Sequence, residues 1–486
     1  MPRASTDVSH SPAAAQSREE PALIPGAPDR LPAAALIAAL GSMMFAGAIT
    51  VLWGMFDPLA LALATAGTVA ALASALVARS HVSVSGKLVA ALLALGVALS
   101  FVHDALYLPG VNVDPAALGA FRPILFFVAC LVASLAWRGA PRWLGIVRFG
   151  AVVLAASFLG ALVIHASPSP AMDVWTMQQQ GANALVGGYD PYAIAYPNVY
   201  GPGTPYISPE LLTPDGRYVL GFPYMPLILL LDVPSAWLGD VRWTMLVAVA
   251  VAAVLIRSLG RGALVAELAA CLLLVQPQAF FLLEMAWTEP VALALALAAA
   301  LAAARSVRGA AGWRSWGTSG LLLGLAISSK QYMVLVLAPL LLVYARRHLV
   351  RILAVAAAVA AVIAVPFLVA DPAAFLHGVL KFQVLQPFRP DALSWPAAIV
   401  ALGGPVLPSW PAFVLAGATF AVTVRRELTV ARALLAGGAF WAVLVIFNKQ
   451  AFLNYYWFAL GLLAAGVAAL AADRAAPLVG GTPAEP

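Results

Sequence analysis

Apolar segments long enough to cross a membrane recur along most of this sequence, and they limit the possible folds more than any other feature. Four of them approach or exceed the ~20 apolar residues that a helix needs to span a bilayer; they are residues 31–53, 87–108, 144–165 and 351–369. Because lipid offers an open backbone no hydrogen-bond partners, such segments form helices packed in a bundle. The chain is 63% hydrophobic and 10% charged. It is therefore predicted to be an all-α polytopic membrane protein with about 13 to 15 transmembrane helices.

The N-terminal segment and the two cysteines narrow the possible classes further. Residues 1–30 are polar and rich in Pro and Ala, which predicts a disordered tail rather than a cleavable secretion signal. Cys130 and Cys271 fall inside apolar segments and show neither a disulfide pattern nor metal-ligand spacing. The net charge of +6 comes from arginines spread over short loops, so it does not favour nucleic-acid binding.

The distribution of basic residues predicts how the chain is oriented in the membrane. Arg and Lys gather in loops 79–87 and 137–148, whereas the alternate loops carry acids and almost no basic residues. Short basic loops face the cytoplasm, so we expect cytoplasmic termini and an extracytoplasmic segment after residue 165. Residues 226–238 are apolar but short, and we expect a juxtamembrane helix there. The predicted parts are a cytoplasmic tail 1–30, an additional four-helix segment 31–143, a core 144–472 with an extracytoplasmic loop 166–224, and a cytoplasmic tail 473–486.

The loop 166–224 is the longest polar stretch between apolar segments. Asp173 follows a Ser-Pro-Ser-Pro helix stop, and is either an acid in the first turn of a helix or a catalytic carboxylate. The loop holds seven of the chain's twelve tyrosines and nine prolines. Such a composition suits a rigid sugar-binding wall and equally an aromatic belt at the membrane interface. The candidate substrate-binding residues in this loop are Gln178, Asp190, Tyr192 and Tyr200.

Basic residues on the predicted outer face are the second candidate feature. The chain has four lysines, and three of them (Lys330, Lys381 and Lys449) fall in predicted outer turns, as does Arg389. Each one alone is explained by snorkelling toward lipid headgroups. As a set beside amides and aromatic residues, they favour a site for a lipid-linked phosphate, with Lys330 and Arg389 as its main residues.

Several other polar residues are weaker candidates. Glu284 and Glu289 lie near a helix end, where ionisable groups are costly and often functional. Asn454 and Tyr455 extend the same predicted outer face, and Glu289 is grouped with them as substrate-binding. His377 and His165 are also candidates, although an ordinary structural role explains either histidine. No metal site and no cofactor are predicted, because no acids or histidines show clear ligand spacing.

Two ordered motifs in this sequence resemble a known superfamily. The first runs from an apolar helix through Asp173, Gly181, Leu185, Gly188 and Asp190-Pro-Tyr192 to Pro226 and another apolar helix. The second is Gly320-Leu-Leu-Leu-Gly-Leu-Ala-Ile-Ser-Ser-Lys330-Gln-Tyr, followed by an apolar run and Arg346-Arg347. Together these motifs resemble the GT-C superfamily of integral-membrane glycosyltransferases, and within it family 87, the polyprenol-phosphate-mannose-dependent mannosyltransferases. The resemblance covers roughly residues 145–350. The four preceding helices depart from the usual helix count of that family, but their even number keeps the Asp173 loop outside.

The resemblance implies a GT-C-like bundle and a transferase activity. Asp173 would be the general base that takes the proton of an acceptor hydroxyl in an inverting single displacement. The donor would be a sugar, mannose or another hexose or pentose, on a polyprenyl phosphate. Lys330, Arg389, Lys449 and Lys381 would bind that phosphate. The acceptor would be an extracytoplasmic glycolipid, polysaccharide or protein. Separately, the Ala- and Arg-rich, Lys-poor composition fits the plasma (inner) membrane.

Two other functions remain compatible with the sequence. A transporter or a flippase for lipid-linked sugars also needs many helices and a few buried charges, but it predicts broken helices and ionisable groups near the bilayer midplane. A structural protein of an envelope complex would not need the set of outward basic residues. The gathering of polar residues at one predicted face favours the transferase.

Overall fold

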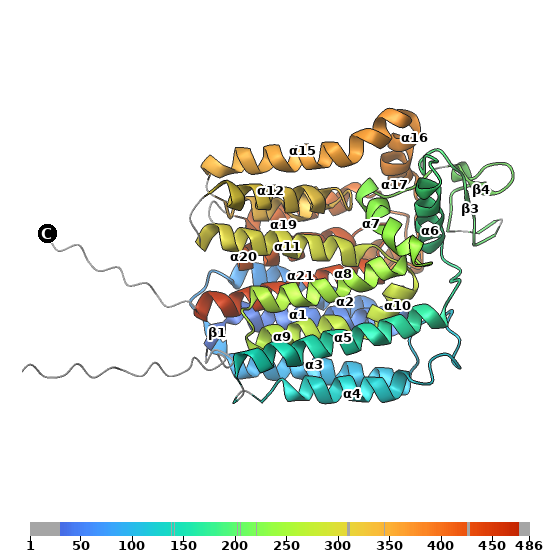
Figure 1. Ribbon diagram of the computed structural model, residues 1–486. Helices are drawn as coiled ribbons and strands as arrows, with labels where there is room; N and C mark the ends of the chain where they lie inside the picture. The colour runs from blue at the N-terminus through green and yellow to red at the C-terminus, as the bar shows by residue number, and fades with distance from the viewer. Residues whose placement is uncertain are drawn as a thin grey trace, which may run out of the picture.

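The structure is a computed structural model that describes residues 30–475, except 138, 140, 202, 205, 220, 309–311, 345 and 425–427. The predicted tail 1–30 falls almost wholly outside the described residues, as does most of the predicted tail 473–486. The chain forms a helical bundle whose long helices run side by side (Figure 1). Its principal helices are α1 Ala33–Thr50, α2 Pro58–Val77, α3 Gly86–Leu106, α4 Phe121–Ser134, α5 Arg142–Ala166, α8 Arg242–Leu259, α9 Leu264–Val275, α11 Glu289–Arg308, α12 Trp313–Ile327, α15 Arg346–Ala370, α19 Trp410–Thr423, α20 Val430–Ile446 and α21 Leu453–Ala475.

Shorter elements join these helices. The short helices are η1 Val51–Gly54, α6 Asp173–Val186, η2 Pro209–Leu211, α7 Pro226–Trp237, α10 Gln278–Glu284, α13 Met333–Val336, α14 Ala338–Leu341, α16 Pro372–Leu376, the π-helix η3 His377–Lys381, α17 Phe382–Leu385 and α18 Trp395–Ala401. Two antiparallel strand pairs complete the described elements: β1 Arg30–Pro32 with β2 Ser83–Ser85, and β3 Tyr196–Pro197 with β4 Arg217–Tyr218.

Local sequence signals explain where several helices begin and break. The Asp57 carboxylate caps α2 by accepting hydrogen bonds from the backbone N–H groups of Leu59 (2.8 Å) and Ala60 (3.1 Å). Pro277 interrupts an apolar run, and α9 and α10 are accordingly bent by 51° at that break. The broken segment matters for the site because α10 supplies one of its walls.

The chain is a multi-pass membrane protein. Across the described residues, eight helices are long and apolar enough to cross a membrane, or nine with the bent pair α9–α10. Four shorter apolar helices, α4, α7, α19 and α20, accompany them. The predicted total of about 13 to 15 crossings therefore requires short helices to cross as well as long ones. Helix α7 has the short length expected for residues 226–238.

The bundle has two distinct ends. The β1–β2 pair and the end of α21 lie at one end, and α6, β3, β4, α16 and α17 lie at the other (Figure 1). At the first end, Arg79 and Arg432 connect the end of α2 to α19 and α20: Arg79 donates to the carbonyl of Thr423 and Arg432 to that of Ala78. The end of α2, the end of α19 and the start of α20 thus meet at one end of the bundle.

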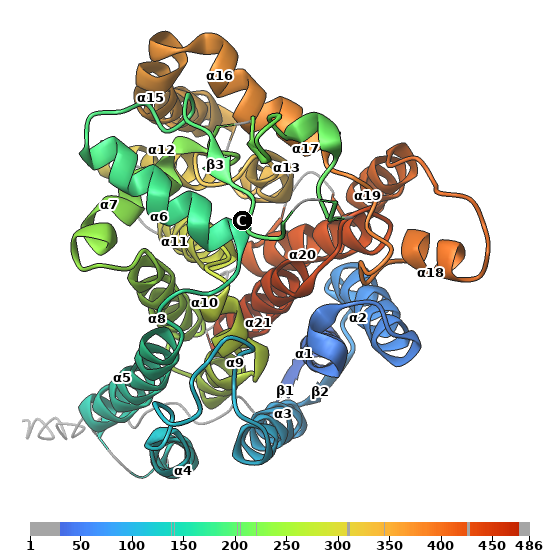
Figure 2. The same ribbon diagram turned by 90° about the vertical axis from the view of Figure 1, so that its right-hand side faces the viewer.

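The first four helices pack directly on the rest of the bundle. Helix α1 packs against α21, α2 against α20, α3 against α9, and α4 against α5. The view along the bundle places α1 and α2 beside the C-terminal helices α20 and α21 (Figure 2). Whether residues 31–143 are a separate unit stays a prediction, but the turn after α1 reaches the site described next.

Candidate active site

A cavity of about 320 Å³ lies at the end of the bundle that carries α6. Residues from eight separated stretches of the chain line it, and many of these were assigned to the same face by the charge pattern. Its polar lining consists of Asp173, Tyr200, Tyr206, Tyr224, Lys330, Gln383, Gln386, Arg389, Asp391, Gln450, Asn454 and Tyr455. Its apolar lining consists of Trp53, Met55, Met172, Val174, Met177, Pro223, Phe281, Met285, Trp287, Phe382 and Phe452.

Asp173 is the first residue of α6, and its carboxylate faces this cavity. The hydroxyl of Tyr200 donates to Oδ1 at 2.9 Å, and the hydroxyl of Tyr218 lies 3.5 Å from Oδ2. The backbone N–H of Val174 also donates to Oδ1 at 2.8 Å. Asp173 is thus an acid in the first turn of a helix, as one of the two interpretations predicts, and at the same time a partly exposed carboxylate in a pocket.

The surroundings of Asp173 favour the protonated form of its carboxyl group. Burial raises the pKa of the Asp173 carboxyl above its ordinary value, and the hydrogen bond from Tyr200 and the positive charge of Arg389 oppose this effect. Burial also raises the pKa of both Tyr200 and Tyr218, and the neighbouring carboxylate raises it further, so both phenols stay protonated donors. A carboxylate that is held by two phenols and that prefers to take up a proton is suited to act as a base.

A buried network fixes the position of α6 relative to the bundle. Arg242, which has no exposed surface, forms an ion pair with Asp240 and donates to the carbonyls of Ile164 and Ser167 at the end of α5. Trp175 of α6 donates through its indole nitrogen to Asp240 at 3.4 Å. These contacts at the end of α5 hold in place the segment that leads into Asp173.

Lys330 lies at the opposite end of α12 from Trp313 and reaches the cavity. Gly320 and Gly324 allow α12 to pack tightly on α15, since a Cβ at either position would lie 2.8 Å from a backbone carbonyl of α15. The Lys330 ammonium lies 2.8 Å from Oε1 of Glu289 and 4.9 Å from the centre of the Tyr224 ring. The lysine is almost fully buried, and it is paired with a carboxylate that is itself fully buried.

Arg389 is held more rigidly than Lys330. Its guanidinium donates twice to the carboxylate of Asp391, from Nε at 2.8 Å and from Nη2 at 2.6 Å. The same group lies 4.2 Å from the centre of the Tyr206 ring and 4.8 Å from that of Phe452. This bidentate, stacked arrangement fixes a positive charge at the rim of the cavity.

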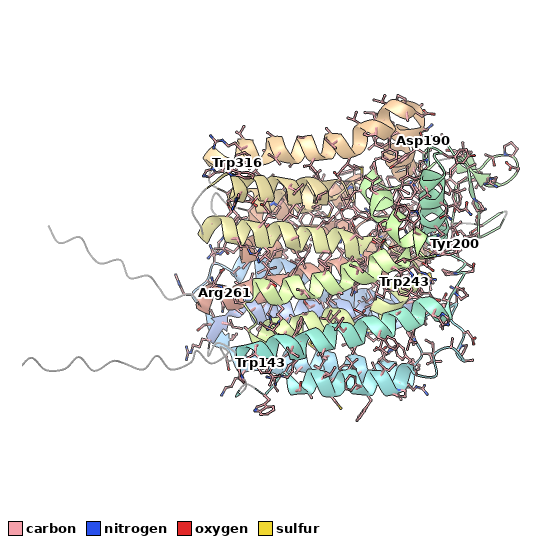
Figure 3. All side chains as sticks on the ribbon, in the orientation of Figure 1. Trp143, Asp190, Tyr200, Trp243, Arg261 and Trp316 are labelled. Carbon is pink, nitrogen blue, oxygen red and sulfur yellow. The ribbon has the colours of Figure 1, made fainter. Side chains whose placement is uncertain are left out.

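The structure brings six of the twelve predicted site residues onto the cavity and leaves six outside its lining. Asp173, Tyr200, Lys330, Arg389, Asn454 and Tyr455 line it. Figure 3 shows Tyr200 and Asp190 at the same end of the molecule, opposite Arg261 and Trp316. The residues outside the lining are Lys381, Lys449, Gln178, Asp190, Tyr192 and Glu289.

Most of the residues outside the lining have structural contacts that account for them. Lys449 donates to the carbonyls of Val384 (3.0 Å) and Gln386 (2.5 Å), while Lys381 is exposed. Gln178 donates to the carbonyl of Ala286 at 2.6 Å, which ties α6 to the α10–α11 turn. Glu289 lies outside the lining and accepts from the Lys330 ammonium at 2.8 Å and from the Tyr332 hydroxyl at 3.2 Å.

The loop residues Asp190 and Tyr192 hold the Tyr/Pro loop together. Asp190 accepts from the backbone N–H of Tyr192 at 2.9 Å, and the Tyr192 hydroxyl donates to the carbonyl of Tyr224 at 2.8 Å. The Tyr192 ring packs edge-on against Phe222, Phe367 and Phe375. These contacts place the Tyr/Pro loop as a packed wall of the pocket.

The weaker candidates lie elsewhere. Glu284 is buried and accepts from the backbone N–H groups of Val111 (2.8 Å) and Asn112 (2.5 Å), so it anchors the α3–α4 loop. His165 is exposed on α5, and His377 belongs to the π-helix η3, outside the cavity lining. Burial lowers the pKa of His377. Within the ranges that the structure describes, no group of three or more His, Cys, Asp and Glu side chains could hold a metal ion.

Sequence reasoning missed several lining residues. Tyr206 and Tyr224 were part of the conspicuous Tyr-rich loop, and Gln383, Gln386 and Asp391 neighbour Arg389, so proximity in the sequence could have indicated them. Trp53 and Met55 carry no such signal, because they follow an apolar helix far from the motifs.

Comparisons with known proteins give one match, to a solved structure. No protein-family model matches this sequence, and no curated protein matches it. Among solved structures, the crystal structure of ArnT from Cupriavidus metallidurans bound to undecaprenyl phosphate matches with a TM-score of 0.44 and 18% sequence identity. The match covers 68% of this chain and 60% of the ArnT chain, so this chain spans less than two thirds of that protein's length.

Proposed function

We propose that the chain is a membrane glycosyltransferase that moves a sugar from a polyprenyl-phosphate donor to an acceptor hydroxyl outside the cytoplasm. The observation that carries the proposal is the single cavity that Asp173, Lys330 and Arg389 share. These three residues were selected from separate motifs and loops, 59 or more positions apart in the sequence. A base and two cations in one pocket supply what the reaction needs at the attacking and the leaving oxygen.

The proposed reaction is a single inverting displacement. Asp173 takes the proton of the acceptor hydroxyl while that oxygen bonds to the anomeric carbon of the donor sugar. The bond from the anomeric carbon to the phosphate oxygen breaks, and polyprenyl phosphate leaves with the bonding electrons. A positioned carboxylate base contributes typically about 10²–10⁴-fold to the rate. Its negative charge also stabilises an oxocarbenium-like transition state.

The two cations have different capacities to bind the leaving phosphate. Lys330 uses one N–H donor on Glu289 and faces the cavity with its remaining donors. Arg389 already spends its Nε–H and an Nη2–H on Asp391. Both cations therefore keep N–H groups for the phosphate. Lys330 is the main phosphate ligand in this proposal, and Arg389, whose position is fixed by Asp391, also supplies a positive field near Asp173. Lys381 and Lys449, which lie outside the lining, are not needed for it.

The sugar hydroxyls would meet carboxamides and phenols. Gln383, Gln386, Gln450 and Asn454 line the cavity together with Tyr200, Tyr206, Tyr224 and Tyr455. Neutral donors and acceptors of this kind suit the hydroxyls of a hexose or pentose, and flat rings suit its apolar face. The resemblance of the two motifs to GT-C family 87 supports mannose as the first sugar to test. The charge pattern supports cytoplasmic termini, and the Ala- and Arg-rich, Lys-poor composition supports the plasma membrane.

A transfer assay in liposomes tests the proposal. Purified full-length protein would be incubated with radiolabelled polyprenyl-phosphate mannose, glucose and arabinose and with the lipid and glycan fractions of the cell envelope. We expect label to pass from one donor to a new product. Movement of donor or of a soluble sugar across the bilayer without a glycosyl product would instead support the transporter or flippase.

A further inference from the structure

A second, apolar crevice of about 430 Å³ lies beside the candidate active site. Helices α1, α2 and α3 line it together with the break between α9 and α10. Met43, Leu63, Leu99, Leu272 and Pro277 represent these four elements in its lining. Its volume is that of an ordinary ligand pocket.

The crevice is open to the membrane and offers few polar groups. Leu99, which lines it, is 55% exposed on the outer surface of α3, one of the membrane-crossing helices. The hydroxyls of Thr50 and Ser100 donate to the carbonyls of Ala46 and Gly96 in their own helices. His103 is the remaining polar residue of the lining, and its Nδ1 pairs with Asp104 at 3.3 Å. The rest of the lining is apolar, so a hydrocarbon chain fills the crevice favourably.

The α1–α2 turn and the α9–α10 break contribute residues both to this crevice and to the catalytic cavity. Val51 lines the crevice and Trp53, two residues later, lines the cavity. Likewise Pro277 lines the crevice and Phe281 lines the cavity. The rings of Trp53 and Phe281 meet edge to face, with centroids 4.8 Å apart. This aromatic pair therefore lies on the cavity side of the α1–α2 turn and of α10.

The turn that carries Trp53 is strained and firmly held. Leu52 (φ 46°) and Trp53 (φ 59°) are consecutive non-glycine residues in the left-handed region, which costs about 1–3 kcal/mol each and persists only where the surroundings impose it. The restraints come from the Arg389 loop, since the backbone N–H of Phe56 donates to the carbonyl of Asp391 at 2.9 Å. The turn that carries Trp53 is therefore hydrogen-bonded to the loop that carries Arg389.

The chemistry of the proposed reaction determines from which side of the cavity each substrate approaches. An inverting displacement needs the acceptor oxygen on the face of the sugar opposite the leaving phosphate. Lys330, the proposed phosphate ligand, follows α12. Figure 2 shows α12 and α13 on one side of α20 and α21, and α1 and α3 on the other side. The acceptor then approaches from the side of α1, where the crevice lies.

We propose that this crevice holds the hydrocarbon chain of a lipid-borne acceptor, whose hydroxyl group passes Trp53 to reach Asp173. The inference rests on the proposed function and narrows the acceptor from glycolipid, polysaccharide or protein to a membrane lipid. The long chain lies along the outer halves of α1 and α3, and the head group lies in the cavity. Trp53 separates the chain from the reacting sugar.

A matched pair of crevices provides the control. Another apolar crevice, of about 500 Å³, lies between α3, α4 and α9 and serves as the control crevice. None of its lining residues line the catalytic cavity. Ala46→Phe adds a ring to the first crevice, and Ala129→Phe adds the same ring to the second. Both alanines are half-buried. Gly47→Val is a milder second blocker, since a Cβ there meets only Leu63, at 3.4 Å.

The test compares acceptors with and without their chains. Full-length protein in liposomes receives radiolabelled polyprenyl-phosphate mannose and, as acceptor, either a total membrane lipid extract or the same extract after alkaline removal of its acyl chains. We expect Ala46→Phe to lower kcat/KM for the intact extract at least about 10-fold. Its KM for the donor and its rate with the deacylated extract should match wild type. Gly47→Val should act in the same direction, and Ala129→Phe should match wild type throughout.

Other outcomes overturn the inference in distinguishable ways. A higher donor KM in Ala46→Phe would show that the crevice serves the donor chain. If Ala46→Phe lost the same fraction of its transfer rate with both extracts, the substitution would have a structural effect instead. If neither Ala46→Phe nor Gly47→Val lowered the transfer rate, the crevice would have no role in acceptor binding. Label found only in polysaccharide or protein would contradict a lipid acceptor while retaining the transferase. If wild type transferred no sugar from any of the three donors, the proposed function itself would fail.

Discussion

The Tyr200 hydroxyl donates a hydrogen bond to Oδ1 of Asp173 at 2.9 Å, joining a loop tyrosine to the first residue of α6. This bond stabilises the charged form of the carboxylate, whereas burial raises its pKa. A base must be ionised to act, so activity is lost as the pH falls through the raised pKa. We therefore expect the acid limb of kcat/KM above the ordinary range for aspartate.

Removing this bond gives the first prediction. Tyr200→Phe should move the acid limb to still higher pH, because the carboxylate loses a donor. Hydrogen bonds to charged groups are worth about 1.5–3 kcal/mol, so the acid limb should move by about 1–2 pH units and kcat/KM on the acid side of that limb should fall about 10- to 100-fold. A pH–rate profile in liposomes measures both effects. An unshifted limb would show that Tyr200 does not act on the base.

The second prediction concerns stability. A carboxyl whose pKa is raised by folding favours the folded state while it is protonated, and this contribution is lost as the pH rises through the folded pKa. At neutral pH the Asp173 carboxylate therefore costs stability. Asp173→Asn should keep or raise the Tm in detergent at pH 7, and its advantage over wild type should shrink toward pH 4. A lower Tm at pH 7 would mean that the carboxylate is needed for the fold.

The third prediction separates the two roles of Lys330. Breaking a buried ion pair by removing one partner typically costs about 3–5 kcal/mol, so Lys330→Met should lower the Tm and raise the KM for the donor. Adding Glu289→Met removes the unpaired carboxylate and should restore much of the Tm, but not the use of the donor. Thermal unfolding and donor titration on the single and double variants measure this. Recovery of donor use in the double variant would remove Lys330 from the phosphate site.

The fourth prediction compares Arg389 with Lys381, the last residue of η3. Arg389→Lys keeps the charge but loses the double hydrogen bond to Asp391 and the stacking on Tyr206, so kcat/KM should fall about 10-fold. Lys381→Ala, at an exposed position outside the cavity lining, should stay within about twofold of wild type. Equal losses in the two variants would point to a general loss of positive charge rather than to the geometry at Arg389.

The helical bundle, and the gathering of polar residues at one of its ends, could be predicted from the sequence. Both predictions rest on local signals, namely the length of apolar segments and the placement of basic residues. Asp173 and Lys330 could be found because each follows a helix in a recognisable motif. The structural roles of Lys449 and Gln178 could not, since their partners are backbone carbonyls 63 and 108 positions away. The reach of Trp53 into the cavity depends on how α1 packs against α21, and no pattern within 31–143 encodes that distant contact.

The most direct measurement of the central claim is sugar transfer by Asp173→Asn beside Asp190→Asn, both as full-length protein in liposomes with a polyprenyl-phosphate donor that wild type uses. Both substitutions remove one carboxylate from the same loop region, but only Asp173 lines the cavity. The account predicts that Asp173→Asn loses at least about 10²-fold in kcat with its fold intact, while Asp190→Asn retains most of its activity. Near-normal turnover by Asp173→Asn would contradict the account.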